Sequence, residues 1–79
     1  MEHMVGTYKN FTIKSFPLQL VNTGLWKTHI AILWERDGIC NSRSFSGDTS
    51  HPTEDEAHLD GISFGQLIID RKVPDLWLD

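Results

Sequence analysis

Residues 52–70, PTEDEAHLDGISFGQLIID, decide the fold of this chain. Thr53 and Glu56 have the spacing of a capping box, in which the threonine hydroxyl accepts a hydrogen bond from the backbone amide three residues later. The acidic residues 54–56 also complement the positive end of a helix dipole. The pattern therefore predicts a helix that begins after Thr53 and ends at about Ile69 or Asp70.

One stripe of this helix lacks side chains at two of its positions. The stripe repeats at helical spacing through Ala57, Gly61, Phe64, Gly65 and Ile68. Two interior glycines cost about 2 kcal/mol of helix propensity relative to alanine. Close packing against a sheet, beneath Trp26 and Trp34, would offset that cost. A second interpretation ends the helix at Gly65 and makes residues 67–69 a short strand.

Three stretches before the helix have the alternation of β-strands: Tyr8–Phe16, Leu25–Glu35 and Ile39–Phe45. Pro17 ends the first stretch or places it at a sheet edge, and residues 22–24 have the composition of a turn. In the second stretch the large side chains fall on one face, which we expect to point to the core: Trp26, Thr28, Ile30, Ile32 and Trp34. Residues 46–52 are expected to form a polar loop.

Two registers compete between the second and third strands. A two-residue turn at Asp37-Gly38 would pair Trp34 with Asn41 and place polar groups on the core face. A three-residue loop with a left-handed glycine would pair Trp34 with Cys40 instead. We prefer the second register because it sets small residues beside large ones. It also points Phe45 to the outer face.

The expected fold is α+β, a three-stranded antiparallel meander packed on one C-terminal helix and followed by a short tail. Residues 5–79 should form a single small domain, near the lower size limit for independent folding. We set residues 1–4 aside as disordered or as a remnant of cloning. The tail carries three large apolar residues that should contact their own domain or a partner: Leu76, Trp77 and Leu78.

The composition is that of an acidic globular domain. Hydrophobic residues make up 39% and the net charge is −4, which argues against strong binding to duplex nucleic acid. A single cysteine excludes an intrachain disulfide and favours a reducing compartment. No apolar run approaches the roughly 18 residues of a membrane span, and residues 1–10 lack a hydrophobic stretch. We therefore expect a cytoplasmic protein with no membrane partner.

The order of the elements resembles a group of small uncharacterised bacterial β-β-β-α domain proteins. The likeness rests on Trp26–Trp34 and on residues 53–57, 61–65 and 68–70. It implies a three-stranded sheet on one helix and no known activity. A weaker likeness, to the partially RNase H-like antitoxins, rests on Gly47-Asp48-Thr49 and Asp55-Glu56-Ala57.

No combination of residues predicts a catalytic, cofactor or metal site. The four histidines lack the spacing of a metal-binding motif, and His58 should lie on the exposed surface of the helix. Cys40 could serve as a nucleophile only beside a base, but the preferred register points Cys40 to the core and His29 outward. We therefore expect a protein that is not an enzyme and needs no cofactor.

The face of the sheet away from the helix carries the strongest functional prediction. An exposed apolar cluster on an acidic chain more often marks a protein partner than a nucleic acid. We expect a non-enzymatic protein-interaction domain whose partner is a second copy, forming a homodimer through this open face, or another protein. The expected interface consists of Ala31, Leu33, Phe45, Leu76, Trp77 and Leu78.

The alternative is a nucleic-acid-binding or antitoxin-type regulatory module on the same face. A flat face with cations and an aromatic ring can stack bases, as single-strand binders do. The expected ligand face consists of Lys14, Lys27, His29 and Arg43.

Overall fold

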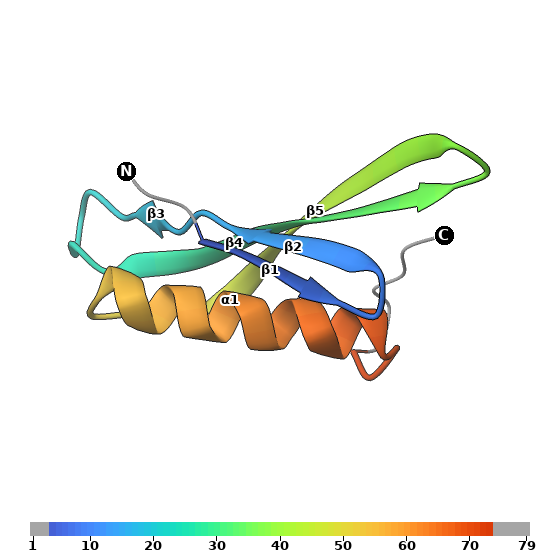
Figure 1. Ribbon diagram of the computed structural model, residues 1–79. Coiled ribbons are helices and arrows are strands. Elements are labelled where there is room, and N and C mark those ends of the chain that lie inside the picture. The colour runs from blue at the N-terminus through green and yellow to red at the C-terminus, as the bar shows by residue number, and fades with distance from the viewer. Residues whose placement is uncertain (1–3, 74–79) are drawn as a thin grey trace.

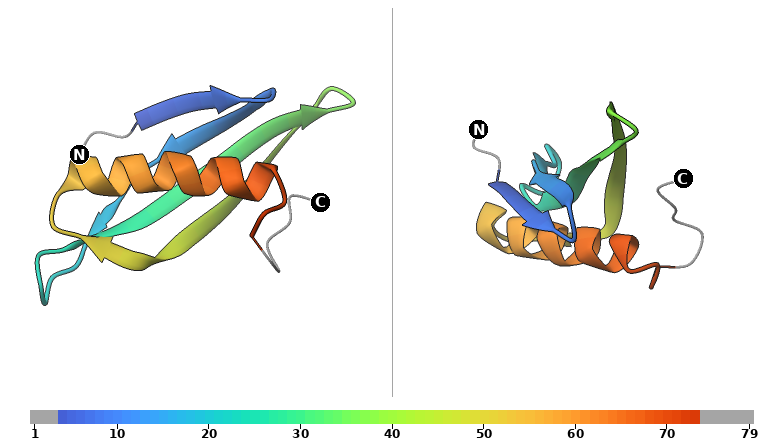
Figure 2. Two further views of the ribbon diagram at one scale, coloured as in Figure 1. Left: turned by 90° about the horizontal axis from the view of Figure 1, so that it is seen from below. Right: turned by 45° about the vertical axis from the view of Figure 1, so that its right-hand side comes forward.

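The computed structural model describes residues 4–73, apart from the side chain of Asp48, and these residues form five strands and one helix. The elements are β1 (Met4–Tyr8), β2 (Phe11–Ser15), β3 (Leu18–Gln19), β4 (Trp26–Arg36), β5 (Ile39–His51) and α1 (Glu54–Ile69). The strands build one antiparallel sheet, and α1 covers one of its faces (Figure 1, Figure 2). The α+β class is confirmed, whereas three strands is an undercount.

The undercount arises at both ends of the first expected strand. Lys9 and Asn10 form a tight turn with φ of 49° and 70°, so β1 folds back on β2. Pro17 lacks an amide hydrogen and separates β2 from β3. Both β2 and β3 pair with β4, along residues 30–33 and 26–27 respectively. Met4, which the sequence analysis set aside, is the first residue of β1.

The preferred register between β4 and β5 is wrong. Trp34 lies opposite Asn41, and the turn holds two residues, Asp37 and Gly38, with φ of 54° and 78°. Positive φ at both central positions is typical of a type I′ turn, whose twist matches that of the paired strands. The polar side chains that argued against this register are not buried in the core, because the end of the hairpin projects beyond α1 (Figure 1).

Strand β5 continues to His51 through the stretch expected to be a polar loop. A bulge makes this possible, because Lys27 pairs with Ser50 whereas His29 pairs with Ser46. Gly47 lies at the bulge, where a Cβ atom would come within 3.1 Å of the Cβ atom of Thr28. The absence of a side chain therefore lets the two strands stay close at this point.

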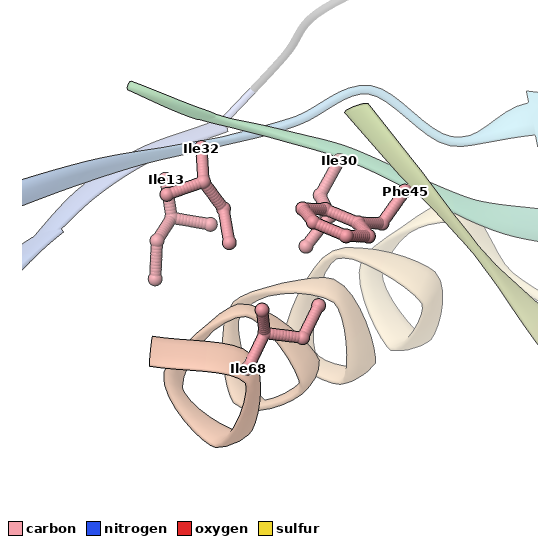
Figure 3. Close-up of a cluster of buried hydrophobic side chains, with 5 residues drawn as sticks. All are labelled: Ile13, Ile30, Ile32, Phe45 and Ile68. Carbon is pink, nitrogen blue, oxygen red and sulfur yellow. The ribbon is translucent and has the colours of Figure 1, made fainter. Parts of the chain in front are cut away.

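The core lies between α1 and the middle of the sheet (Figure 3). Its buried cluster consists of Ile13, Ile30, Ile32, Phe45 and Ile68. Phe45 is only 8% exposed and lies opposite Ile30. Its expected outward orientation is therefore wrong, as a direct consequence of the two-residue turn.

Helix α1 has the expected ends. The Thr53 hydroxyl accepts a hydrogen bond from the amide of Glu56 at 3.2 Å, and Asp70 is the C-cap. Residues 67–69 are helical, so the short-strand interpretation is wrong. The capping signal in the sequence was therefore sufficient to place the helix.

The two helix glycines lie directly against the sheet, as expected. A Cβ atom on Gly61 would lie 2.7 Å from Oγ of Ser15, and one on Gly65 would lie 2.9 Å from both Cγ2 and Cδ1 of Ile13. The contacted strands are β2 and β4. Trp26 and Trp34, expected above the glycines, are half-buried near the two ends of β4.

The register can be tested by truncating Phe45. We expect Phe45→Ala to destabilise the protein by about 3 kcal/mol, because it removes a buried aromatic side chain. Ser44→Ala, on the neighbouring exposed position, should change stability by less than about 0.5 kcal/mol. Urea unfolding followed by tryptophan fluorescence measures both, and equal small effects would contradict the observed register.

Candidate functional site

The face of the sheet opposite α1, here called the outer face, has no covering layer among residues 4–73 (Figure 2). Its side chains form rows across the strands. Val5, Lys14, Ala31 and Ser44 make one such row, in which each residue is paired with the next. Ala31, Leu33, Lys14, Lys27 and His29 are all half-buried by their neighbours in the sheet.

The distal end of the outer face, toward the β4–β5 turn, contains a hollow of about 240 Å³. It forms next to the first residues of β2, where β4 continues beyond its last residue paired with β2. The last such pair is Thr12 with Leu33. The hollow is mostly apolar and is lined by Asn10, Thr12, Leu33, Trp34, Glu35 and Cys40.

The opposite, proximal end carries a cluster that we call the basic–aromatic patch: Lys14, Phe16, Lys27 and His29. The rings of Phe16 and His29 meet edge to face with centroids 4.7 Å apart. Nδ1 of His29 lies 2.8 Å from the hydroxyl oxygen of Ser46. Lys14 and Lys27 lie on either side of this ring pair along the sheet. Sequence reasoning missed Phe16, although its period-two spacing from Thr12 and Lys14 could have placed it outward.

The structure brings together only part of each predicted set of site residues. Lys14, Lys27 and His29 share the outer face with Ala31 and Leu33, as expected. Arg43 does not, because it lies opposite Ile32 on the side of the sheet that carries α1. Phe45 is buried in the core, and the predicted contacts Leu76, Trp77 and Leu78 lie outside the described residues.

Cys40 is exposed and lies opposite Glu35 on the outer face. Its expected burial is wrong for the same reason as the orientation of Phe45. His29 shares this face but lies six residues away from Glu35 along β4, about 20 Å at the rise of an extended strand. The imidazole of His29 is therefore too far away to act as a base for the thiol of Cys40.

A polar cluster links α1 to the bulge of β5. Oδ2 of Asp60 accepts hydrogen bonds from the hydroxyls of Thr28 at 2.7 Å and Thr49 at 3.4 Å, and it lies 3.2 Å from Nε2 of His51. Nε2 of His51 also lies 3.5 Å from the hydroxyl oxygen of Thr49, so the carboxylate and this hydroxyl share one ring nitrogen. This arrangement bridges α1 and the bulge of β5.

A second polar cluster joins the β1–β2 turn to the end of α1. Asp70 accepts hydrogen bonds from the hydroxyl of Tyr8 at 2.6 Å and from Nζ of Lys9 at 2.5 Å. The pKa of Asp70 is lowered from its usual value of 3.8. The hydrogen bond from Lys9 is the largest cause, and the hydrogen bond from Tyr8 is the second. The same contacts with the carboxylate raise the pKa of Tyr8 and of Lys9.

His58, expected on the exposed helix surface, is only 4% exposed, and its Nδ1 atom has no hydrogen-bond partner among the described residues. No group of three or more His, Cys, Asp or Glu side chains within the described part of the chain is arranged to hold a metal ion. Within residues 4–73, no helix combines the length and apolar character that crossing a bilayer requires.

Comparisons with known proteins give no information on the function of this chain. No family model, no curated protein and no solved structure matches the chain.

The Asp70 cluster predicts a specific dependence of stability on pH. Since the pKa of Asp70 is lower in the folded state, its contribution is present above about pH 4 and is lost as the pH falls through the folded value. Asp70→Asn should therefore be less stable than wild type at pH 7, and the gap should close toward pH 2. Urea midpoints across this range measure the gap, and a constant difference would contradict the prediction.

Proposed function

We propose that this chain is a non-enzymatic protein-interaction domain that forms a homodimer through the distal end of its open sheet face. The observation that carries the proposal is the hollow beside Leu33, which lies on a sheet face without a second layer among the described residues. A domain with one helix can bury only one face of its sheet. A second copy would supply the missing layer on the other.

The shape of the hairpin supports a partner at this end. Beyond Leu33, β4 has no pairing strand on the side of β2, so residues 34–41 project as a two-stranded ribbon. An isolated ribbon of two strands is marginally stable in water. Contact with a second copy would therefore stabilise this part of the molecule as well as cover the hollow.

The distribution of charge also favours the distal end. Lys27 lies at the proximal end, opposite Leu18, so a contact centred on Leu33 keeps the Lys27 side chains of two copies apart. Like charges brought together in an interface cost several kcal/mol. Ala31 and Leu33 are the described apolar contacts that we propose.

A stable dimer usually buries about 800 Å² on each partner. The tail residues Leu76, Trp77 and Leu78 would contribute large apolar area, and on their sequence alone we include them in the proposed interface. We further propose that the protein works in the cytoplasm, where the exposed thiol of Cys40 would stay reduced.

Sedimentation velocity at about 100 μM tests the dimer, a concentration at which micromolar association is nearly complete. We expect wild type to sediment as a dimer and Leu33→Glu as a monomer, because the substitution would bury two charges in the contact. Leu59→Glu is the matched control, since Leu59 is 67% exposed on α1, and it should remain dimeric. A monomeric wild type would contradict the proposal.

A further inference from the structure

We propose that the basic–aromatic patch, Lys14, Phe16, Lys27 and His29, binds single-stranded nucleic acid. This site lies at the proximal end of the outer face, away from the hollow, and it goes beyond the proposed dimer. It needs neither the tail nor a second copy. It differs from the ligand face expected from the sequence in two residues, because it lacks Arg43 and includes Phe16.

The ring pair supplies a platform for a base. Phe16 follows buried Ser15 and precedes buried Pro17, so its ring is held against His29 at the sheet surface. The backbone amide of Phe16 also donates to the carbonyl oxygen of His29 at 2.9 Å, which ties the two residues together across the strands. An aromatic ring fixed on a flat sheet can stack an unpaired base of any type.

One tautomer of His29, compatible with its hydrogen bond to Ser46, equips the patch for a phosphate. When the Ser46 hydroxyl donates to Nδ1, the neutral imidazole carries its hydrogen on Nε2. Nε2 then offers a donor on the far side of the ring from Ser46. A phosphodiester oxygen is an acceptor of matching character.

Two lysines extend the patch along the sheet. Lys14 lies opposite Ala31, and Lys27 lies four residues before Ala31 on β4, about 13 Å away along the strand. The ring pair lies between them. A backbone lying along β4 would thus place a base on the aromatic platform and phosphates near both ammonium groups.

Most of the described acidic side chains lie on other parts of the molecule. The acidic side chains of α1 and its C-cap belong to the other side of the sheet: Glu54, Asp55, Glu56, Asp60 and Asp70. On the outer face the described acidic residue is Glu35, at the distal end beside the hollow. Among the described side chains, negative charge therefore lies mainly away from His29.

Fluorescence anisotropy with a short labelled oligothymidylate tests the site. We expect a dissociation constant of about 1–100 μM that weakens as salt rises from about 50 to 200 mM. Phe16→Leu should weaken binding about tenfold by removing the stacking surface, and Lys27→Glu by a similar factor through lost phosphate contact. Lys72→Glu is the matched control, because it changes net charge equally on the helix side, and it should retain binding.

Thermal melting of each variant separates lost binding from lost folding, and Lys14→Glu gives a second test of the cation role. Three results would overturn the proposal: no binding by wild type, equal loss in Lys72→Glu, or equal affinity for a duplex of the same length. Inorganic pyrophosphate is a further probe. If it competes at the same concentration as the oligonucleotide, and Phe16→Leu has no effect, the patch binds anions without recognising nucleic acid.

Discussion

The contact between two glycines of α1 and the side chains of β2 and β4 determines the rest of the structure. Without Cβ atoms at Gly61 and Gly65, the helix approaches so closely that any added carbon would overlap Ser15, Ile30 or Ile13. This closeness lets short aliphatic side chains fill the core of a very small domain, where long side chains would hold the layers apart. It also offsets the weak helix propensity of glycine.

A single closely packed helix leaves the molecule with two unlike faces. The helix side carries most of the described acidic residues, together with the polar bridges at Asp60 and Asp70. The outer face carries Lys14 and Lys27 at one end and an apolar hollow at the other. Both functional proposals follow from this asymmetry; the dimer contact centres on Leu33 and the nucleic-acid site on Phe16 and His29 of the same face.

The sequence was sufficient where a signal was local. The capping box predicted where α1 begins, and strict alternation identified the core face of β4. Local signals failed where two alternatives differ by a small free energy. The β4–β5 register depended on whether Arg43 would be buried, and that depends on how far the hairpin projects past α1. That one register error predicted Phe45 on the outer face and Cys40 in the core, the reverse of their observed positions. The turn at Lys9 and Asn10 was not predicted because it contains no glycine, although asparagine tolerates the left-handed conformation that Asn10 adopts.

A double-mutant cycle between Gly65 and Ile13 tests the helix–sheet contact most directly. At an open helix site, Gly→Ala stabilises by about 1 kcal/mol. We predict instead that Gly65→Ala destabilises wild type by about 1–3 kcal/mol through overpacking. In an Ile13→Ala background, which removes all three crowded atoms, the same substitution should become neutral or stabilising. Additive effects, or stabilisation of wild type by Gly65→Ala, would contradict the close contact on which this account depends.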